Sequence, residues 1–402
     1  MLNLTQYVHI FEGGASGHMS KPQDFPELTL KELKDLVLSV FGYSDPVEFT
    51  EKLDGTNIQA TMNNQGEVVF IRNKGNLNSE KGGMSISDMQ EKWKDNPSVA
   101  HTFVQAGQIL ERVFKKIGKE FFNPNEYTRI YVNCECITAG KTNIMVYGED
   151  SVDIHNLWIY KKDGNEWKKD SVTRNGLDKI QKVFDKDDKA KLTPKVIMKV
   201  NDLSKKYADE ICKGLDSLWK QEGLSEDDSL EKWQHIRFKK VAPEWMTDED
   251  GAFFNRWFKM DKSINMRVLK KNYPDHANEL TEIDKKDSKK YVSDVMDPID
   301  KLFVKCGNYA ISLINGLVNG DPRNKKVTDE LRNDLDNVKK EVENIDDMDT
   351  KAKFVMMLQK LGDENEINAT EGIVFTWKGR MMKLTGSFAA LNQCLGLLRF
   401  KR

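Results

Sequence analysis

A lysine placed two residues before an Asp-Gly pair is the part of this sequence best suited to covalent chemistry. Residues 51–57 read Glu-Lys-Leu-Asp-Gly-Thr-Asn and directly follow an extended run at 47–50. A lysine at a strand end can act as a nucleophile if nearby positive charge or exclusion of water keeps its amine neutral. Asp-Gly is also the commonest dipeptide of hairpin turns, so a surface hairpin with a solvated Lys52 is the alternative.

Later apolar segments carry single charged or aromatic residues that suit the same chemistry. Arg72 ends an alternating apolar run, Glu135 interrupts an apolar strand, and Tyr160 ends an aromatic one. Glu371 opens another predicted strand, and Lys383 lies in the middle of a short one. Taken singly, a glutamate in a strand is usually on the solvated face of its sheet, and a tyrosine there is usually part of the core.

In chain order these residues read Lys-x-Asp-Gly, Arg, Glu, aromatic, Glu-Gly and Lys. This order resembles the motifs of the covalent nucleotidyltransferases, which are ATP-dependent DNA ligases, RNA ligases and mRNA capping enzymes. It is most similar to the RNA ligases of tailed bacteriophages. The resemblance covers residues 47–162 and 368–386. Thr385 stands where the family usually carries a second lysine, and the chain between Glu135 and Glu371 is far longer than these enzymes usually need.

The resemblance implies catalytic roles for three residues. Lys52 would attack the α-phosphorus of ATP, expel pyrophosphate and carry AMP on its side chain. Lys383 would touch the α-phosphate and disfavour the charged form of the nucleophile. Glu371 would help to hold a hydrated Mg²⁺, which prefers carboxylate oxygens and retained waters.

The resemblance also implies an ATP-binding set. Arg72 would bridge ribose and phosphate, Glu135 would accept from the ribose hydroxyls, and Tyr160 would stack on adenine. The set implied by the resemblance comprises Asp54, Gly55, Arg72, Glu135 and Tyr160.

Composition limits the partners and the compartment. The chain has 402 residues, enough for two or three domains, and its net charge of only −2 means that any nucleic-acid binding must come from local patches. The five cysteines form no CxxC pair and predict buried thiols of a reducing compartment. We find no membrane span and no charged leader, and therefore expect a cytoplasmic protein, in the host cytoplasm if the chain is viral. The histidines are scattered without ligand spacing, and none is assigned a role.

The expected fold is α+β, with antiparallel sheets and flanking helices around an ATP cleft. Residues 1–46 would form a glycine-rich loop and a helix that Thr29 caps, and residues 47–171 and 367–402 the adenylyltransferase domain. Residues 172–366 would form an α-helical insertion, in which Asp297-Pro298 starts the clearest helix. The chain ends soon after Gly386, so we expect no C-terminal OB-fold.

One stretch of the predicted insertion is basic, with aromatic residues interleaved, as suits a nucleic-acid backbone with bases stacked nearby. The alternative is a solvated helix face whose aromatics belong to the core. The candidate nucleic-acid residues are Arg256, Lys259, Arg267, Lys270 and Lys271.

The reaction that the resemblance implies is the joining of a 5′-phosphate to a 3′-hydroxyl, with ATP and Mg²⁺ as cofactors and RNA favoured over DNA as partner. Two other classes remain open. One is an adenylyltransferase that passes AMP to a protein or a small molecule. The other is a retired nucleotide-binding or virion-associated module, which Thr385 supports best.

Overall fold

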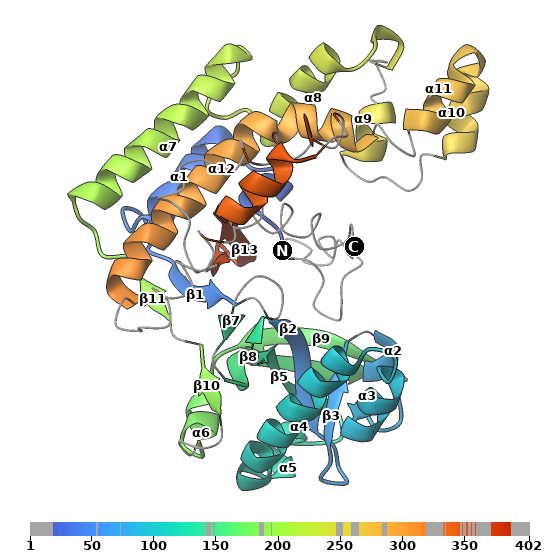
Figure 1. Ribbon diagram of the computed structural model, residues 1–402, viewed down its shortest axis with the longest axis vertical. Coiled ribbons are helices and arrows are strands. Elements are labelled where there is room, and N and C mark those ends of the chain that lie inside the picture. The colour runs from blue at the N-terminus through green and yellow to red at the C-terminus, as the bar shows by residue number, and fades with distance from the viewer. Residues whose placement is uncertain are drawn as a thin grey trace.

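Two β-sheets divide the structure, and helices cover one face of each (Figure 1). The computed structural model is a mixed α/β protein whose sheets are antiparallel except for one parallel pair, β8 with β10. The residues that it describes are 19–53, 55–72, 74–138, 140–141, 146–147, 149–184, 189–193, 195–246, 252–258, 265–283, 288–318, 333, 335–345, 348, 351–352, 355, 358 and 371–386. The glycine-rich loop at 11–18 and the end of the chain after Gly386 lie outside these residues.

The larger sheet has the order β10-β8-β5-β2-β3-β4, and β9 pairs with β8. One face packs on α4 through buried side chains such as Ile58, Val132 and Phe103. Its strands are β2 (Thr56–Met62), β3 (Val68–Ile71), β4 (Met84–Ser85), β5 (Thr128–Ile137), β8 (Ser151–Asp163), β9 (Glu166–Thr173) and β10 (Ala190–Leu192). Its helices are α2 (Lys74–Leu77), α3 (Ile86–Lys92), α4 (Pro97–Ile117), α5 (Lys119–Phe122) and α6 (Leu177–Gln181), and β6 (Gly140–Lys141) pairs with β7 (Val146–Tyr147).

The smaller sheet has the order β11-β1-β12-β13, and its core face is covered by helices that precede β1 or follow β11 in the chain. Phe49, Phe375 and Met382 occupy one row across this sheet and are buried against these helices. Its strands are β1 (Glu48–Lys52), β11 (Val196–Ile197), β12 (Gly372–Trp377) and β13 (Arg380–Thr385). The helices of this part are η2 (Pro22–Asp24), α1 (Leu30–Val40), α7 (Asp202–Gln221), α8 (Leu230–Val241), η3 (Glu244–Met246), α9 (Ala252–Trp257), α10 (Met266–Asn272), η4 (Pro274–His276), α11 (Ala277–Glu282) and α12 (Ser288–Val318).

The chain passes between the sheets through two short connections that lie side by side. It leaves the smaller sheet from β1 to enter β2, and it returns from β10 to β11 (Figure 1). The connections are neighbours because β11 pairs with β1, with Val196 opposite Phe49. Lys52 is therefore the last residue of the smaller sheet before the chain enters the larger one.

Local signals predicted α1 well, whereas two expectations about the helical region were wrong. Thr29 caps α1 and forms a capping box with Glu32, as expected. The helical region begins later than residue 172, because β10 and β11 still belong to the sheets and α7 starts only at Asp202.

Helix α12 begins at Ser288, so Pro298 lies inside the helix and does not start it. A proline in a helix interior leaves a carbonyl of the preceding turn without its amide donor. Here Arg237 of α8 donates to the carbonyl of Asp294 at 3.3 Å and to that of Val295 at 2.9 Å. A contact from another helix thus compensates for the local cost of the proline.

Among the described residues, no helix is both long enough and apolar enough to cross a membrane.

Candidate active site

The face of the smaller sheet that points away from its helical core carries the first group of site residues. Directly paired residues of neighbouring strands project on the same face. Lys52, Gly372 and Thr385 form one row, because Gly372 pairs with both of the others. In the next row Val374 lies between Thr50 and Lys383. Both lysines therefore project from adjacent rows of one face.

Glu371 joins these two lysines at the start of β12. Its carboxylate forms an ion pair with the ammonium of Lys52, and the two side chains are only 20% and 25% exposed. Burial and then the positive charges of Lys52 and Lys21 lower the pKa of Lys383 from its ordinary value, whereas Glu371 acts in the opposite direction. Several cations are thus held together around one carboxylate, an arrangement that attracts a polyanion.

Glu135 lies on the larger sheet, in a row with Asn57 and Asp153. The amide of Asn57 donates to Glu135 Oε2 at 3.2 Å, and His155 Nε2 lies 3.7 Å from the same oxygen. Asp153 is buried, which raises the pKa of its carboxyl, and Lys191 lies 3.4 Å away. The carboxylate of Glu135 is therefore held by polar neighbours on both sides, on the face opposite to α4.

Gly55 brings the connection after Lys52 against this carboxylate. A Cβ at this position would lie 2.6 Å from the carbonyl oxygen of Cys136 and 2.8 Å from Cγ of Glu135. Only glycine allows that approach, so Gly55 lets the connection pack closely on β5 of the larger sheet. Asp54 itself lies outside the described residues.

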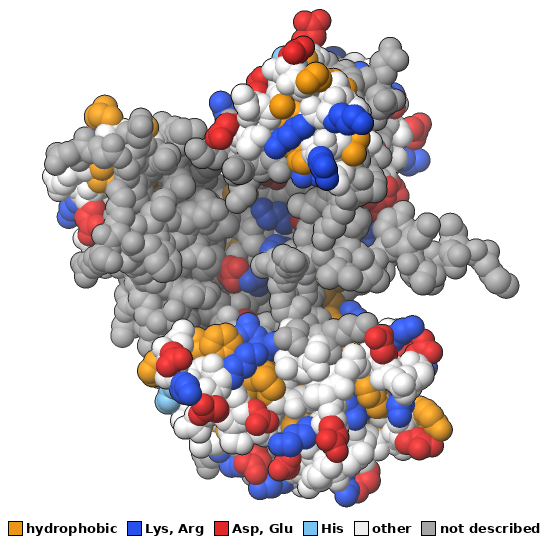
Figure 2. Space-filling view, turned by 90° about the vertical axis from the view of Figure 1, so that its right-hand side faces the viewer, with side chains coloured by type: hydrophobic (Ala, Val, Ile, Leu, Met, Phe, Trp, Pro, Cys, Tyr) orange, Lys and Arg blue, Asp and Glu red, His pale blue; other side chains and the backbone are white. Residues whose placement is uncertain are grey.

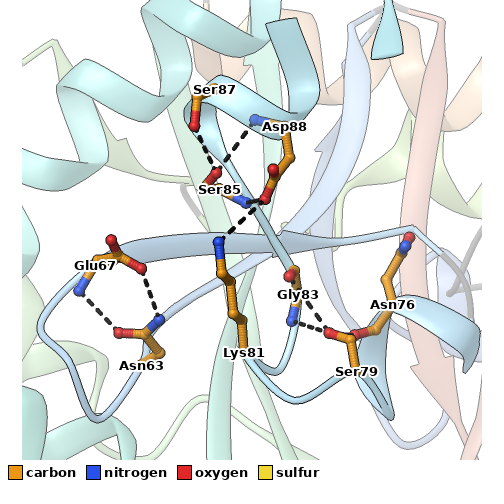
Figure 3. A network of polar contacts seen from close by, with 9 residues as sticks. All are labelled: Asn63, Glu67, Asn76, Ser79, Lys81, Gly83, Ser85, Ser87 and Asp88. Carbon is orange, nitrogen blue, oxygen red and sulfur yellow. Dashed lines mark hydrogen bonds and ion pairs between the residues drawn. The ribbon is translucent and has the colours of Figure 1, made fainter. Parts of the chain in front are cut away.

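Arg72 points away from this group. Its guanidinium carbon lies 5.7 Å from the ring centroid of Trp93 and 5.6 Å from that of Phe103, on the α4 side of the larger sheet. Its backbone amide donates to the side chain of Asn76 at 3.4 Å. Figure 3 shows Asn76 next to Ser79, whose hydroxyl accepts from the amide of Gly83 at 3.0 Å. The segment after Arg72 is thus folded back and fixed, and the structure does not bring this arginine to Glu135.

Tyr160 is also remote from Glu135. It pairs with Arg129, six residues before Glu135 on β5, which corresponds to about 20 Å along a strand. The ring is only 4% exposed and packs edge-on against Tyr131 at 5.3 Å, and the hydroxyl donates to Gln59 at 2.8 Å. Burial raises the pKa of the phenol. These contacts are those of a core tyrosine, and a nucleotide with its ribose on Glu135 could not place adenine on this ring.

The candidate nucleic-acid residues divide into exposed and covered ones. Arg267 and Lys271 of α10 are exposed one helical turn apart, whereas Arg256 and Lys270 are half-buried. Figure 2 shows basic side chains next to hydrophobic ones at the top of the view, over α10 and α11. Lys259 lies outside the described residues.

Of the aromatic side chains of α9 that the structure describes, Phe253 and Phe254 offer no stacking surface. Phe254 and Phe253 are buried in the helical core, and Phe258 stacks on Phe254 with the ring centroids 4.8 Å apart. In this respect the alternative, a basic face over core aromatics, describes the structure better.

Three residues at the site had not been singled out from the sequence. Asn57 and His155 contact Glu135, and Lys21 comes beside Lys383 from a segment that precedes α1. Asn57 lies two residues after Gly55 in the same segment as Lys52, so its position was a usable signal. His155 and Lys21 reach the site only through pairing with distant strands, for which the sequence offers no local sign.

Comparison of the chain with family models, curated proteins and solved structures gave no match.

Proposed function

We propose that this chain is an ATP-dependent nucleotidyltransferase of the RNA-ligase type, with a ligase-like fold of two sheets around the nucleotide. The observation that carries the proposal is the ion pair of Lys52 with Glu371, together with Lys383 on the same sheet face. These residues come from opposite ends of the sequence, and the order in which they occur is that of the resembling enzymes.

The proposed first step forms a phosphoramide bond. Lys52 gives up a proton, its nitrogen attacks the α-phosphorus of ATP, and the bond to the pyrophosphate oxygen breaks. Glu371 contacts the ammonium of Lys52 and would receive that proton, while Lys383 would supply positive charge where the phosphate becomes more negative. Catalysis of this kind depends mainly on positioning and charge, which a rigid sheet face supplies.

Magnesium fits the site only as an ion shared between a protein carboxylate and the phosphates of ATP. Within the described part of the chain no group of three or more His, Cys, Asp or Glu side chains could hold a metal. Mg²⁺ commonly uses one or two carboxylates and completes its shell with water and phosphate oxygens. Glu371 would be the protein ligand, and the ion, when bound, would neutralise phosphate charge.

Glu135 is assigned to the ribose, because its carboxylate is held by Asn57 next to the connection that follows Lys52. Arg72 and Tyr160 receive no role in ATP binding, since the structure places both away from Glu135. The second substrate is a 5′-phosphorylated RNA, whose backbone would meet Arg267 and Lys271.

Incubation with α-labelled ATP and Mg²⁺ tests the first step. We expect a labelled, acid-labile protein band that Lys52→Ala abolishes. Lys195→Ala is the matched control, because Lys195 also forms an ion pair with a glutamate of the smaller sheet. That glutamate is Glu48, at the end of β1 opposite to Lys52. An unlabelled wild-type protein would indicate a retired module, and label retained in Lys52→Ala would exclude this lysine as nucleophile.

Addition of 5′-phosphorylated RNA to the labelled enzyme tests the second step. Transfer of AMP to the RNA end supports ligation, and transfer only to protein or small-molecule acceptors would show an adenylyltransferase instead. Reversing Arg267 and Lys271 to Glu should reduce the slope of log K against log salt by roughly 0.7–0.9 for each lost phosphate contact. The same reversal at Lys179 of α6 and at Lys182, which directly follows that helix, should leave that slope unchanged.

A further inference from the structure

The segment before α1 brings a further lysine to the edge of the smaller sheet. Ser20 forms a parallel bridge with Met382, and its carbonyl accepts from the amide of Lys383 at 2.9 Å. Met382 is buried in the helical core, so the next residues, Lys21 and Lys383, both project on the opposite face. The two lysines line one small pocket, of which Thr385 is also part.

The position of Lys21 is fixed by its neighbours on both sides. Its backbone amide donates to the carboxylate of Asp24 at 2.7 Å, which closes the short helix η2. Gln23 of η2 is buried and donates to Asp300 of α12 at 2.8 Å. The backbone of Lys21 is thus anchored to β13 and to α12, and its half-buried side chain is held beside Lys383.

Lys21 adds positive charge to the group formed by Lys52, Lys383 and Glu371. Lys21 and Lys52 both act on Lys383 as positive neighbours, and Glu371 lies among them, while Asp24 and Asp300 stand on the η2 side. Figure 2 shows basic side chains with an acidic one at mid-height, between the part built on the larger sheet and the helical part. Thr385, in one row with Lys52, contributes no charge at the position where a lysine would complete the pair with Lys383.

We propose that Lys21 is a substrate-binding residue that contacts the β- and γ-phosphates of ATP and takes the place of a lysine at position 385. This inference rests on the proposed function and adds to it a specificity for the triphosphate over the nucleoside. Adenosine, which has no phosphates, gains nothing from Lys21.

Binding of the α,β-methylene analogue of ATP and of adenosine, measured by calorimetry in Mg²⁺, tests this assignment without turnover. Lys21→Ala should weaken binding of the analogue about tenfold, the scale of one charge-assisted phosphate contact, and leave adenosine binding unchanged. Lys21→Arg should retain most of the affinity for the analogue. Thr385→Lys added to Lys21→Ala should restore the affinity for the analogue, because a lysine at position 385 would project from the same row as Lys52.

The control is Lys31→Ala, which removes an exposed lysine of α1 and should leave both affinities unchanged. Equal binding of the analogue by Lys21→Ala and wild type would overturn the role of Lys21 and leave the proposed function standing. An equal loss for analogue and adenosine would show a merely structural role. A wild type that binds neither compound would refute the proposed function, and the assignment of Lys21 with it.

Discussion

Gly372 offers a sharp test of the smaller sheet, because it lies between Lys52 and Thr385 and has almost no space around it. A Cβ at this position would press on the carbonyl oxygen of Leu384 and would lie 3.1 Å from Cα of Thr385. Both are backbone atoms of β13, so no side chain can turn aside. Restoring ordinary contact requires β12 and β13 to separate by about 1 Å.

Such a separation would break the ladder where β12 begins. Loss of about two hydrogen bonds at ~1 kcal/mol each predicts that Gly372→Ala lowers the free energy of unfolding by about 2–3 kcal/mol. Gly214→Ala is the control, since its Cβ would meet only the end of the Leu302 side chain, at 2.6 Å. In helix α7 the gain of alanine, up to ~1 kcal/mol, should offset the cost of moving Leu302.

Urea unfolding followed by circular dichroism measures both variants. We expect a clearly lower midpoint for Gly372→Ala and an almost unchanged one for Gly214→Ala. Binding of the ATP analogue should also weaken in Gly372→Ala, because the distance between Lys52 and Lys383 changes. Equal midpoints for Gly372→Ala and wild type would refute the reasoning from backbone contact.

Three further outcomes follow from single contacts. Tyr160→Phe should cost about 1 kcal/mol of stability in urea unfolding, the scale of one buried hydrogen bond, and leave affinity for the ATP analogue unchanged. Arg237→Met should cost about 2–3 kcal/mol in the same assay, because the Asp294 carbonyl that Pro298 leaves unpaired and the neighbouring Val295 carbonyl both lose their contact with Arg237. Burial raises the pKa of Cys212 from 9.0 to about 11. In a Cys394→Ser background a thiol reagent should therefore label Cys212 at pH 8 about 100-fold more slowly than an ordinary thiol, and faster as pH rises towards 11. Fast labelling at pH 8, an unchanged midpoint for Arg237→Met, or weaker analogue binding by Tyr160→Phe would contradict these expectations.

Features decided by neighbouring residues could be predicted from the sequence. The cap of α1 at Thr29 depends on Glu32, three residues away, and both are visible in the sequence. The face of the larger sheet on which Arg72 lies could also be predicted, because Phe70 precedes it by two residues and points to the α4 core. In that case the alternation of the strand was a better guide than the order of motifs.

Features decided by distant pairing could not be predicted from periodicity. Only the resemblance connected Lys52 with Glu371, since no local pattern relates the two strands that carry them. The register of β5 against β8 separates Tyr160 from Glu135, and register depends on contacts that sequence spacing does not reveal. Pro298 led to a wrong prediction of where α12 begins. The donor that compensates for the missing amide of this proline is Arg237, which lies on another helix.

The two adjacent connections between the sheets have a mechanical consequence. Each connection links the smaller sheet to the larger one. Lys52 and Lys195 lie at the smaller-sheet ends, and Gly55 and Thr193 lie at the larger-sheet ends. Thr193 is anchored to the larger sheet, since its hydroxyl lies 2.8 Å from Nδ1 of His155. Any rotation of one sheet against the other must therefore pivot beside Lys52.

A pivot at this place would move the larger sheet around Lys52. Lys52, Glu371 and Lys383 would travel as one body, because β1, β12 and β13 are joined by continuous ladders. Glu135 and Asn57 would swing relative to them. The distance from Lys52 to Glu135 is then adjustable, whereas the arrangement of charges around Lys52 is not. Closure of the two sheets would therefore bring Glu135 towards Lys52 without altering the electric field around that lysine.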